Sequence, residues 1–254
     1  MTQSTVTPPV ARKESTPTTL HGQTLEDNYR WMRDKSSPEL IAYLTAENEY
    51  TTSVMSPTED LQANLYTEML SHIKETDESV PYSDHGWYYY TRTVEGSQYP
   101  IHCRRVGVGA QYDDAQPEQV ILDVNRLAEG QPYMAIGGMS VSPDGHLLAY
   151  STDNTGFRQY TLHVRDLRTG QDLSDTAERV GSLVWAADSH TLFYTTEDEV
   201  TKRHDHLFRH RLGDTVEEDS VLYEERDERF NLGVGKTRDG KYLLMESGSH
   251  TTNE

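Results

Sequence analysis

The sequence predicts a mostly β fold, a series of β-propeller blades preceded by an N-terminal arm with two α-helices. From about residue 79 the chain is a succession of short strand-like runs that no long helical pattern interrupts, which disfavours alternating βαβ architecture. Within that region a turn motif recurs at intervals typical of propeller blades. We therefore expect a poorly ordered, Thr-, Ser- and Pro-rich tail (1–19), a helical arm (20–78) and a propeller region (79–254).

Two amphipathic helices are predicted in the arm. The first begins at Ser37-Pro38, an N-cap followed by a Pro whose missing amide costs nothing at the first helical position, and continues to about Tyr50. The second begins at Ser56-Pro57-Thr58-Glu59, which predicts a capping box between Ser56 and Glu59. An apolar stripe at a spacing of four residues then follows, made of Leu61, Leu65, Met69 and Ile73.

The propeller region contains short runs rich in aromatic and β-branched residues, which are predicted as strands. The first, Trp87–Thr91, is the most aromatic. The others are Tyr99–Arg105, Val120–Val124, Leu147–Ser151, Tyr160–Asp166, Leu192–Thr196, Leu207–Leu212 and Tyr242–Glu246.

A turn motif centred on aspartate precedes several of these strands. Its copies are Ser83-Asp84-His85-Gly86, Ser142-Pro143-Asp144-Gly145, Ala187-Asp188-Ser189 and Arg238-Asp239-Gly240. The aspartates are 60, 44 and 51 residues apart, close to the roughly 40–50 residues of a four-stranded blade. Asp bonds the local backbone and Gly accepts a positive φ, so the motif suits a tight turn. Ordinary hairpin turns of a β-sandwich are the alternative.

The composition excludes several classes of partner. Lys and Arg number 23 against 42 Asp and Glu, a formal net charge of −19, which repels phosphate backbones and anionic lipid. We therefore expect neither a nucleic-acid nor a membrane partner. No apolar run is long enough for a signal peptide or a membrane span, and the single cysteine, Cys103, excludes an internal disulfide framework. A cytoplasmic protein without a cofactor is expected.

One cluster of histidines has the spacing of possible metal ligands. An extended segment would place His204, His206 and His210 on one face, with Asp205 nearby. A zinc site needs three or four convergent ligands, however, and Phe208 occupies the same row. Solvated or packed histidines are the favoured interpretation, and no metal is expected.

Two further segments resemble known catalytic or nucleotide-binding motifs without matching them. Gly233–Thr237 ends like a phosphate-binding loop, but Phe230 stands where the first Gly belongs and a turn follows, so we interpret it as a strand entering a blade turn. Gly138–Ser142 is the nearest approach to a nucleophile elbow and lacks its final Gly. Acidic runs between residues 197 and 228 are interpreted as solvated loops, with attraction of basic peptides as the alternative.

Several segments, taken together and in order, resemble one family of enzymes. The segments are Leu20–Gly22, Asp27–Asp34, Tyr43–Tyr50, Ile73–Tyr82, Gln98–Arg105, Thr155–Tyr160 and Tyr223–Glu228. The first three resemble the N-terminal signature and first long helix of the prolyl oligopeptidase family of serine peptidases. The others are similar to its oligopeptidase B branch, also called protease II. The resemblance spans roughly Pro8 to the last residue.

The resemblance implies a larger architecture than a propeller alone. The family combines an N-terminal arm, a seven-bladed propeller and a C-terminal α/β-hydrolase domain whose Ser, Asp and His hydrolyse short peptides after Arg or Lys. The arm packs on the hydrolase domain, and the propeller excludes folded proteins. We therefore expect this chain to be an incomplete propeller of about three to four blades without the hydrolase domain. No catalytic residue is placed on it, and the chain alone is expected to be inactive.

Arg158 is the one binding residue that the resemblance singles out, because it lies in the shared segment Thr155–Tyr160. It is expected to face the propeller tunnel or the interface with the hydrolase domain, where its guanidinium can pair with a carboxylate. A solvated surface arginine is the alternative.

The expected partners are short basic peptides, for the full-length enzyme, and the hydrolase domain or another chain that covers the open propeller face. The alternative functions are a non-catalytic β-propeller-like interaction module and a split enzyme whose hydrolase domain is a separate chain.

Overall fold

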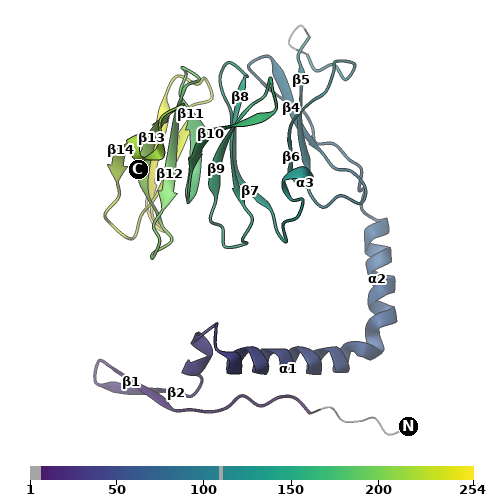
Figure 1. The fold of residues 1–254 in the computed structure, drawn as a ribbon, viewed down its shortest axis with the longest axis vertical. Coiled ribbons are helices and arrows are strands. Elements are labelled where there is room, and N and C mark those ends of the chain that lie inside the picture. Colours follow the sequence, from purple (N-terminus) through teal and green to yellow (C-terminus); the bar gives the residue numbers. More distant parts are fainter. Residues whose placement is uncertain (1–6, 109–110) are drawn as a thin grey trace. The chain divides into compact units, whose positions relative to one another are not determined.

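The computed structural model describes residues 7–108 and 111–254, and the chain divides into two compact units, Met1–Lys74 and Glu75–Glu254 (Figure 1). The division falls four residues before the boundary predicted from the sequence. Residues 1–6 of the predicted tail lie outside the described residues.

The arm begins with a β-hairpin. Strand β1 (Thr16–Leu20) pairs antiparallel with β2 (Gln23–Asp27), and His21 and Gly22 close the turn with φ values of 51° and 78°. Two positive φ values are typical of the type I′ turn, whose twist suits a two-residue hairpin. Residues 16–19, predicted to lie in a poorly ordered tail, therefore form most of a paired strand.

The two predicted helices are present, but the second begins differently. After the short 3-10 helix η1 (Arg30–Arg33), α1 (Pro38–Met55) runs five residues past Tyr50, and η2 (Ser56–Thr58) joins it to α2 (Glu59–Ser71). The Ser56 hydroxyl donates to the Ser53 carbonyl at 3.0 Å, so the predicted capping box is wrong. Because the helical backbone continues through Ser56, its own amide donates to the Thr52 carbonyl and needs no cap.

The helices of the described residues are too short or too polar to cross a membrane. In α2, Leu61, Leu65 and Met69 of the predicted apolar stripe are exposed.

The second unit is built from antiparallel sheets whose strands follow chain order. Blade 1 contains β3 (Tyr82–Asp84), β4 (Trp87–Arg92), β5 (Ile101–Val106) and β6 (Gln119–Asp123), followed by α3 (Val124–Leu127). Blade 2 contains β7 (Ala135–Val141), β8 (Leu147–Asp153), β9 (Thr161–Asp166) and β10 (Gln171–Ala177). Blade 3 contains β11 (Val180–Trp185), β12 (Thr191–Glu197), β13 (His204–Arg211), η3 (Val216–Glu218) and β14 (Ser220–Glu224).

A final hairpin, β15 (Asn231–Lys236) and β16 (Leu243–Gly248), begins a fourth blade. The second unit, over its described residues, thus holds three four-stranded sheets and one two-stranded sheet, and the predicted partial propeller is confirmed. Each copy of the aspartate turn joins the first strand of a blade to the second. In blade 2 the Ser142 hydroxyl and the His146 amide both donate to Asp144 Oδ1, at 2.5 and 3.0 Å.

The core lies in the seams between blades, which stack side by side in Figure 1. At the first seam, Tyr89, Ile121 and Leu122 of blade 1 pack with Leu148, Tyr150 and Leu167 of blade 2. At the second, Leu147, Leu162 and Val164 of blade 2 pack with Trp185, Leu192 and Tyr194 of blade 3. The Trp185 indole also donates to the Ser140 carbonyl at 2.9 Å, so this seam has a polar link as well.

Blades 2 and 3 repeat each other at an offset of 44 residues. The Gly138 amide donates to Ser151 Oγ at 2.8 Å, and at the equivalent place the Ser182 amide donates to Thr195 Oγ1 at 3.0 Å. Both inner strands, β7 and β11, have a register irregularity at this point. The repeat therefore extends to the local backbone distortion.

The offset also explains two glycines of the inner strands. A β-carbon on Gly137 would lie 2.6 Å from the Tyr160 ring, and one on Gly181 would lie 2.7 Å from the His204 ring. Tyr160 and His204 are themselves 44 residues apart, so each covers the glycine of its own blade. Glycine is needed at both positions because a ring fills the space of a side chain.

We expect Gly181→Ala to lower the free energy of unfolding by about 1–3 kcal/mol, because the His204 ring and the Thr195 hydroxyl, 2.7 and 2.8 Å from the new methyl group, must move. Gly233→Ala in β15 is the matched control, since nothing lies within 4 Å of its β-carbon position. Thermal unfolding of both variants measures the difference. Equal melting temperatures would contradict the packing argument.

Candidate functional site

The loop between β8 and β9 carries the candidate residue Arg158. Asp153, only 1% exposed at the end of β8, shapes this loop. Its Oδ1 accepts the Thr155 amide and hydroxyl at 2.8 and 2.6 Å, and its Oδ2 accepts the Arg158 amide at 2.7 Å. These bonds hold Arg158 at a φ of 60°, a left-handed conformation that non-glycine residues seldom adopt.

The hydrogen bonds also set the charge of Asp153. Burial alone would raise the pKa of this carboxyl, but the donors from Thr155, Arg158 and Gly156 outweigh it and hold the pKa below its ordinary value of 3.8. The side chain is therefore ionised at neutral pH, and its oxygens can accept the hydrogen bonds of the loop over the whole physiological pH range.

The loop presents a cation next to exposed aromatic rings. Phe157 is 75% exposed, and a β-carbon on Gly156 would lie 3.9 Å from the ring of the half-exposed Tyr133. The exposed Arg158 guanidinium makes no hydrogen bond or ion pair with residues 7–108 or 111–254. We call Tyr133, Phe157 and Arg158 the rim patch. Aromatic residues and arginine are enriched in protein interfaces, so the rim patch is suited to contact rather than to chemistry.

Blade 3 carries a related arrangement at the 44-residue offset. Lys202 occupies the place of Arg158, with a φ of 61°, and Glu197 occupies the place of Asp153. Glu197 Oε1 lies 3.5 Å from Lys202 Nζ and 3.7 Å from Arg179 Nη1. Arg179 is also left-handed and donates to Glu199 at 2.9 Å. The Lys202 cation is therefore neutralised by Glu197 of the same blade, whereas the Arg158 guanidinium has no such partner among the described residues.

The three candidate metal ligands do not converge. His204 packs over Gly181, His206 Nδ1 lies 2.7 Å from Asp205 Oδ1, and His210 lies in the seam between Asp175 and Asp219. No group of three or more His, Cys, Asp or Glu in the described part of the chain is arranged to hold a metal ion. The predicted common face is wrong for His204: it pairs with Glu197, whereas His206 pairs with the adjacent Thr196, so the register irregularity there turns His204 to the other face of the strand.

The phosphate-loop-like segment is a strand followed by a turn, as interpreted from the sequence. β15 ends at Lys236, and the Gly240 amide donates to the Thr237 carbonyl at 2.9 Å in the turn into β16. The segment therefore opens no helix that could cradle a phosphate.

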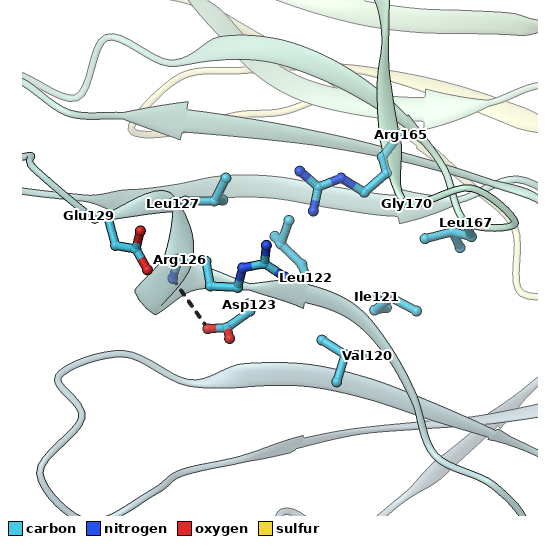
Figure 2. Close-up of a pocket in the computed structure, with 10 residues that line it drawn as sticks. All are labelled: Val120, Ile121, Leu122, Asp123, Arg126, Leu127, Glu129, Arg165, Leu167 and Gly170. Atoms are coloured by element: carbon cyan, nitrogen blue, oxygen red, sulfur yellow. Dashed lines mark hydrogen bonds between the residues drawn. The ribbon is translucent and has the colours of Figure 1, made fainter.

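A groove of about 370 Å³ opens at the seam between blades 1 and 2 (Figure 2). In Figure 2 the Leu122 side chain lies between the guanidiniums of Arg126 and Arg165, and Leu127 also lines the groove. Arg165 is already paired, with both Asp172 oxygens at 2.8 and 3.0 Å. The described residues that line the groove include the carboxylates Asp123 and Glu129 but no Ser, Thr, Cys or His, so they offer no nucleophile with a histidine base.

Sequence reasoning missed Asp153, Arg179 and Lys202. Asp153 and Lys202 could have been found from the 44-residue offset once Arg158 is chosen. Position 202, 44 residues after Arg158, is again a cation, and position 197, 44 residues after Asp153, is again an acid. Arg179 has no such signal, since its left-handed backbone is visible only in the structure.

The comparison with protein families decides the assignment. Residues 8–254 match the prolyl oligopeptidase N-terminal β-propeller domain. The chain belongs to the prolyl oligopeptidase family. This confirms the resemblance found in the sequence.

Similar members of the prolyl oligopeptidase family are much longer. Dipeptidyl aminopeptidase BI of Pseudoxanthomonas mexicana is 41% identical over 99% of this chain and 37% of its own length. Protease 2 of Moraxella lacunata is 35% identical over 97% of this chain and 36% of its own length. The structure of oligopeptidase B from Leishmania major superposes with a TM-score of 0.89 at 32% identity, covering 98% of this chain and 37% of that one. The chain thus spans little more than a third of these family members.

Asp153→Asn is expected to destabilise the protein by about 1–3 kcal/mol, because one oxygen becomes an amide that cannot accept the loop N–H groups. The variant also tests how the stability of the protein depends on pH. The lowered pKa means that the wild-type carboxylate stabilises the fold above pH 3.8 and that this stabilisation is lost as the pH falls through the lowered pKa.

The measurements are thermal unfolding between pH 2 and 7 and limited proteolysis of the β8–β9 loop. Asp239→Asn is the control, since Asp239 bonds its own turn in the same way but is exposed. Equal loss of stability in the two variants would contradict a special role for Asp153.

Proposed function

We propose that this chain is the propeller part of an oligopeptidase B-like serine peptidase that hydrolyses short peptides after Arg or Lys, and that this part controls which substrates reach the active site. The observation that carries the proposal is the match of residues 8–254 to the family's propeller domain. The likeness to oligopeptidase B from Leishmania major supports the finer assignment. The catalytic Ser, Asp and His belong to a hydrolase domain outside these residues.

The geometry of the blades supports a gating role. The sheets stack in chain order with their cores in the seams, so the inner strands β7, β11 and β15 line one side of the unit. A ring of such blades leaves a passage along its axis that an extended peptide can enter and a folded protein cannot.

The position of the rim patch supports a contact with the hydrolase domain. Residues 75–79, which enter the propeller from the arm, bond the end of β4: the Thr93 amide donates to the Asp77 carbonyl at 2.9 Å. The β8–β9 loop leaves blade 2 at the end that corresponds to this connection in blade 1. Since the family's arm packs on the hydrolase domain, we place that domain at this end, with Arg158 opposite one of its carboxylates.

A second substrate preference has its own support. Dipeptidyl aminopeptidase BI, 41% identical to this chain, carries a name that indicates removal of dipeptides from free N-termini. Both preferences belong to the same family chemistry and differ in whether the substrate's amino group must be free.

The complete gene product is expected to hydrolyse an N-blocked Arg-Arg amide but not a folded protein, while the purified 254-residue chain alone gives no turnover. Hydrolysis of only the unblocked Arg-Arg amide would favour the dipeptidyl preference. Turnover by the isolated chain would overturn the assignment of catalysis to another domain. A stable complex with a partner that lacks any hydrolase would favour an interaction module.

Arg158→Ala in the complete gene product is expected to lower kcat/KM by about tenfold, equivalent to roughly 1.4 kcal/mol, because an interdomain ion pair is lost. Arg238→Ala is the matched control: Arg238 is also exposed but lies in the β15–β16 turn, at the other end of a blade. Steady-state kinetics on the blocked amide give the comparison. If both variants keep wild-type kcat/KM, Arg158 is a solvated surface residue.

A further inference from the structure

A buried charge cluster bridges the seam between blades 2 and 3. Its centre is His210 of β13, which is 2% exposed. The ring nitrogen Nε2 lies 3.0 Å from Asp175 Oδ1 of β10, and Nδ1 lies 2.7 Å from Asp219 Oδ1, just before β14. A carboxylate accepts hydrogen bonds and donates none, so both ring nitrogens must carry a hydrogen. The geometry therefore fits an imidazolium between two carboxylates.

The two carboxylates are satisfied from further directions. Asp175 Oδ1 also accepts the Gly213 amide at 2.6 Å, and Asp219 Oδ2 accepts the Tyr194 hydroxyl of β12 at 2.5 Å. Asp175, Asp219 and Tyr194 are the ionisable groups that face His210, directly or through Asp219. The three charged side chains of the cluster are each at most 4% exposed, so solvent screens them little.

The blade repeat shows that this bridge is particular to one seam. In blade 2 the place of His210 is taken by Arg165, because Arg165 pairs with Leu148 as His210 pairs with Leu192, 44 residues further along. Arg165 bonds Asp172 Oδ1 at 2.8 Å, and Asp172 accepts the Tyr150 hydroxyl as Asp219 accepts that of Tyr194. The cation of blade 2 therefore has the counterpart of Asp219, whereas His210 also reaches an aspartate of the preceding blade. Only at the seam of blades 2 and 3, among the described residues, does a histidine link aspartates of two blades.

We propose that His210 is a proton-dependent latch between blades 2 and 3, closed while the imidazolium bridges Asp175 and Asp219 and released when the ring loses its proton. A neutral ring has one N–H for two carboxylates. One buried carboxylate would then face a nitrogen lone pair, which is costly in an interior that screens charge poorly. The latch is a property of the seam and does not depend on the proposed peptidase activity.

The direction of the pH dependence follows from the surroundings of the ring. Burial alone would lower the pKa of His210, but the hydrogen bonds to Asp219 and Asp175 outweigh it and raise the pKa above its ordinary value of 6.5. A raised pKa in the folded state means that the latch stabilises the seam fully below pH 6.5 and that this stabilisation is lost as the pH rises through the raised value.

The test is amide hydrogen exchange of the complete protein between pH 6 and 10, corrected for the intrinsic pH dependence of exchange. Opening of β10 and β13 is expected to become up to about tenfold more frequent per pH unit within the titration window, while β4 and β5 of blade 1 serve as the internal reference. Asp175→Asn removes one of the two charges and is expected to weaken this pH dependence. His206→Gln, on the same strand but bonded to Asp205, is the matched control and is expected to retain it.

A second measurement keeps the test independent of the variants. Nitrogen-15 NMR of the wild-type ring is expected to show both His210 nitrogens protonated at pH 6.5 and one losing its proton only above the ordinary histidine value. A ring that titrates at or below the ordinary histidine value, or a pH dependence of seam opening that Asp175→Asn leaves unchanged, would overturn the proposal.

Discussion

A sheet of this propeller is buried only by the sheet next to it, and the other features of the second unit depend on that constraint. Tyr150 and Tyr194, each 1% exposed, belong to the two seams and not to the interior of a single blade. In β16, by contrast, Leu244 is 53% exposed, because no described sheet packs on that side of the hairpin. Removing apolar surface from water is the main stabilising term, so a blade gains most of its stability from its neighbours.

The 44-residue offset between blades 2 and 3 separates what the fold requires from what is free to vary. The inner-strand irregularity, its hydroxyl acceptor and the covered glycine are present in both blades, because they maintain the same backbone path. The residues that differ are those that carry charge. Tyr160 becomes His204. Arg165, which pairs with Asp172 of its own blade, becomes His210, which bonds Asp219 of its own blade and adds a bridge to Asp175 across the seam. Differences of function between blades can therefore arise by substitution on a fixed scaffold.

The sequence predicted the middle strands of the blades well and missed most of the flanking ones, with β6 and β15 as exceptions. β4, β8 and β12 are dense in aromatic and aliphatic residues that pack into the seams, and β8 contributes to the seams on both of its faces. β7 contains glycines that weaken the strand pattern, and β10 is mostly polar because its outer part faces solvent. Those strands are specified by pairing with neighbours, which local propensity does not record.

The candidate site shows the same limit in its side chains. Alternation along β13 holds for His206 and His210 but fails for His204, because a register irregularity that the sequence does not reveal lies between His204 and His206. The partners of the other two come from elements that no local pattern identifies: Asp205 for His206, and Asp175 with Asp219 for His210. Arg158 was found through a family resemblance, and its surroundings now explain why it is distinctive. In a chain with 42 carboxylates and 23 Lys and Arg, most cations can find an acid nearby. The acid nearest in sequence, Asp153, binds the backbone amide of Arg158 instead, so the fold itself leaves this guanidinium available to another surface.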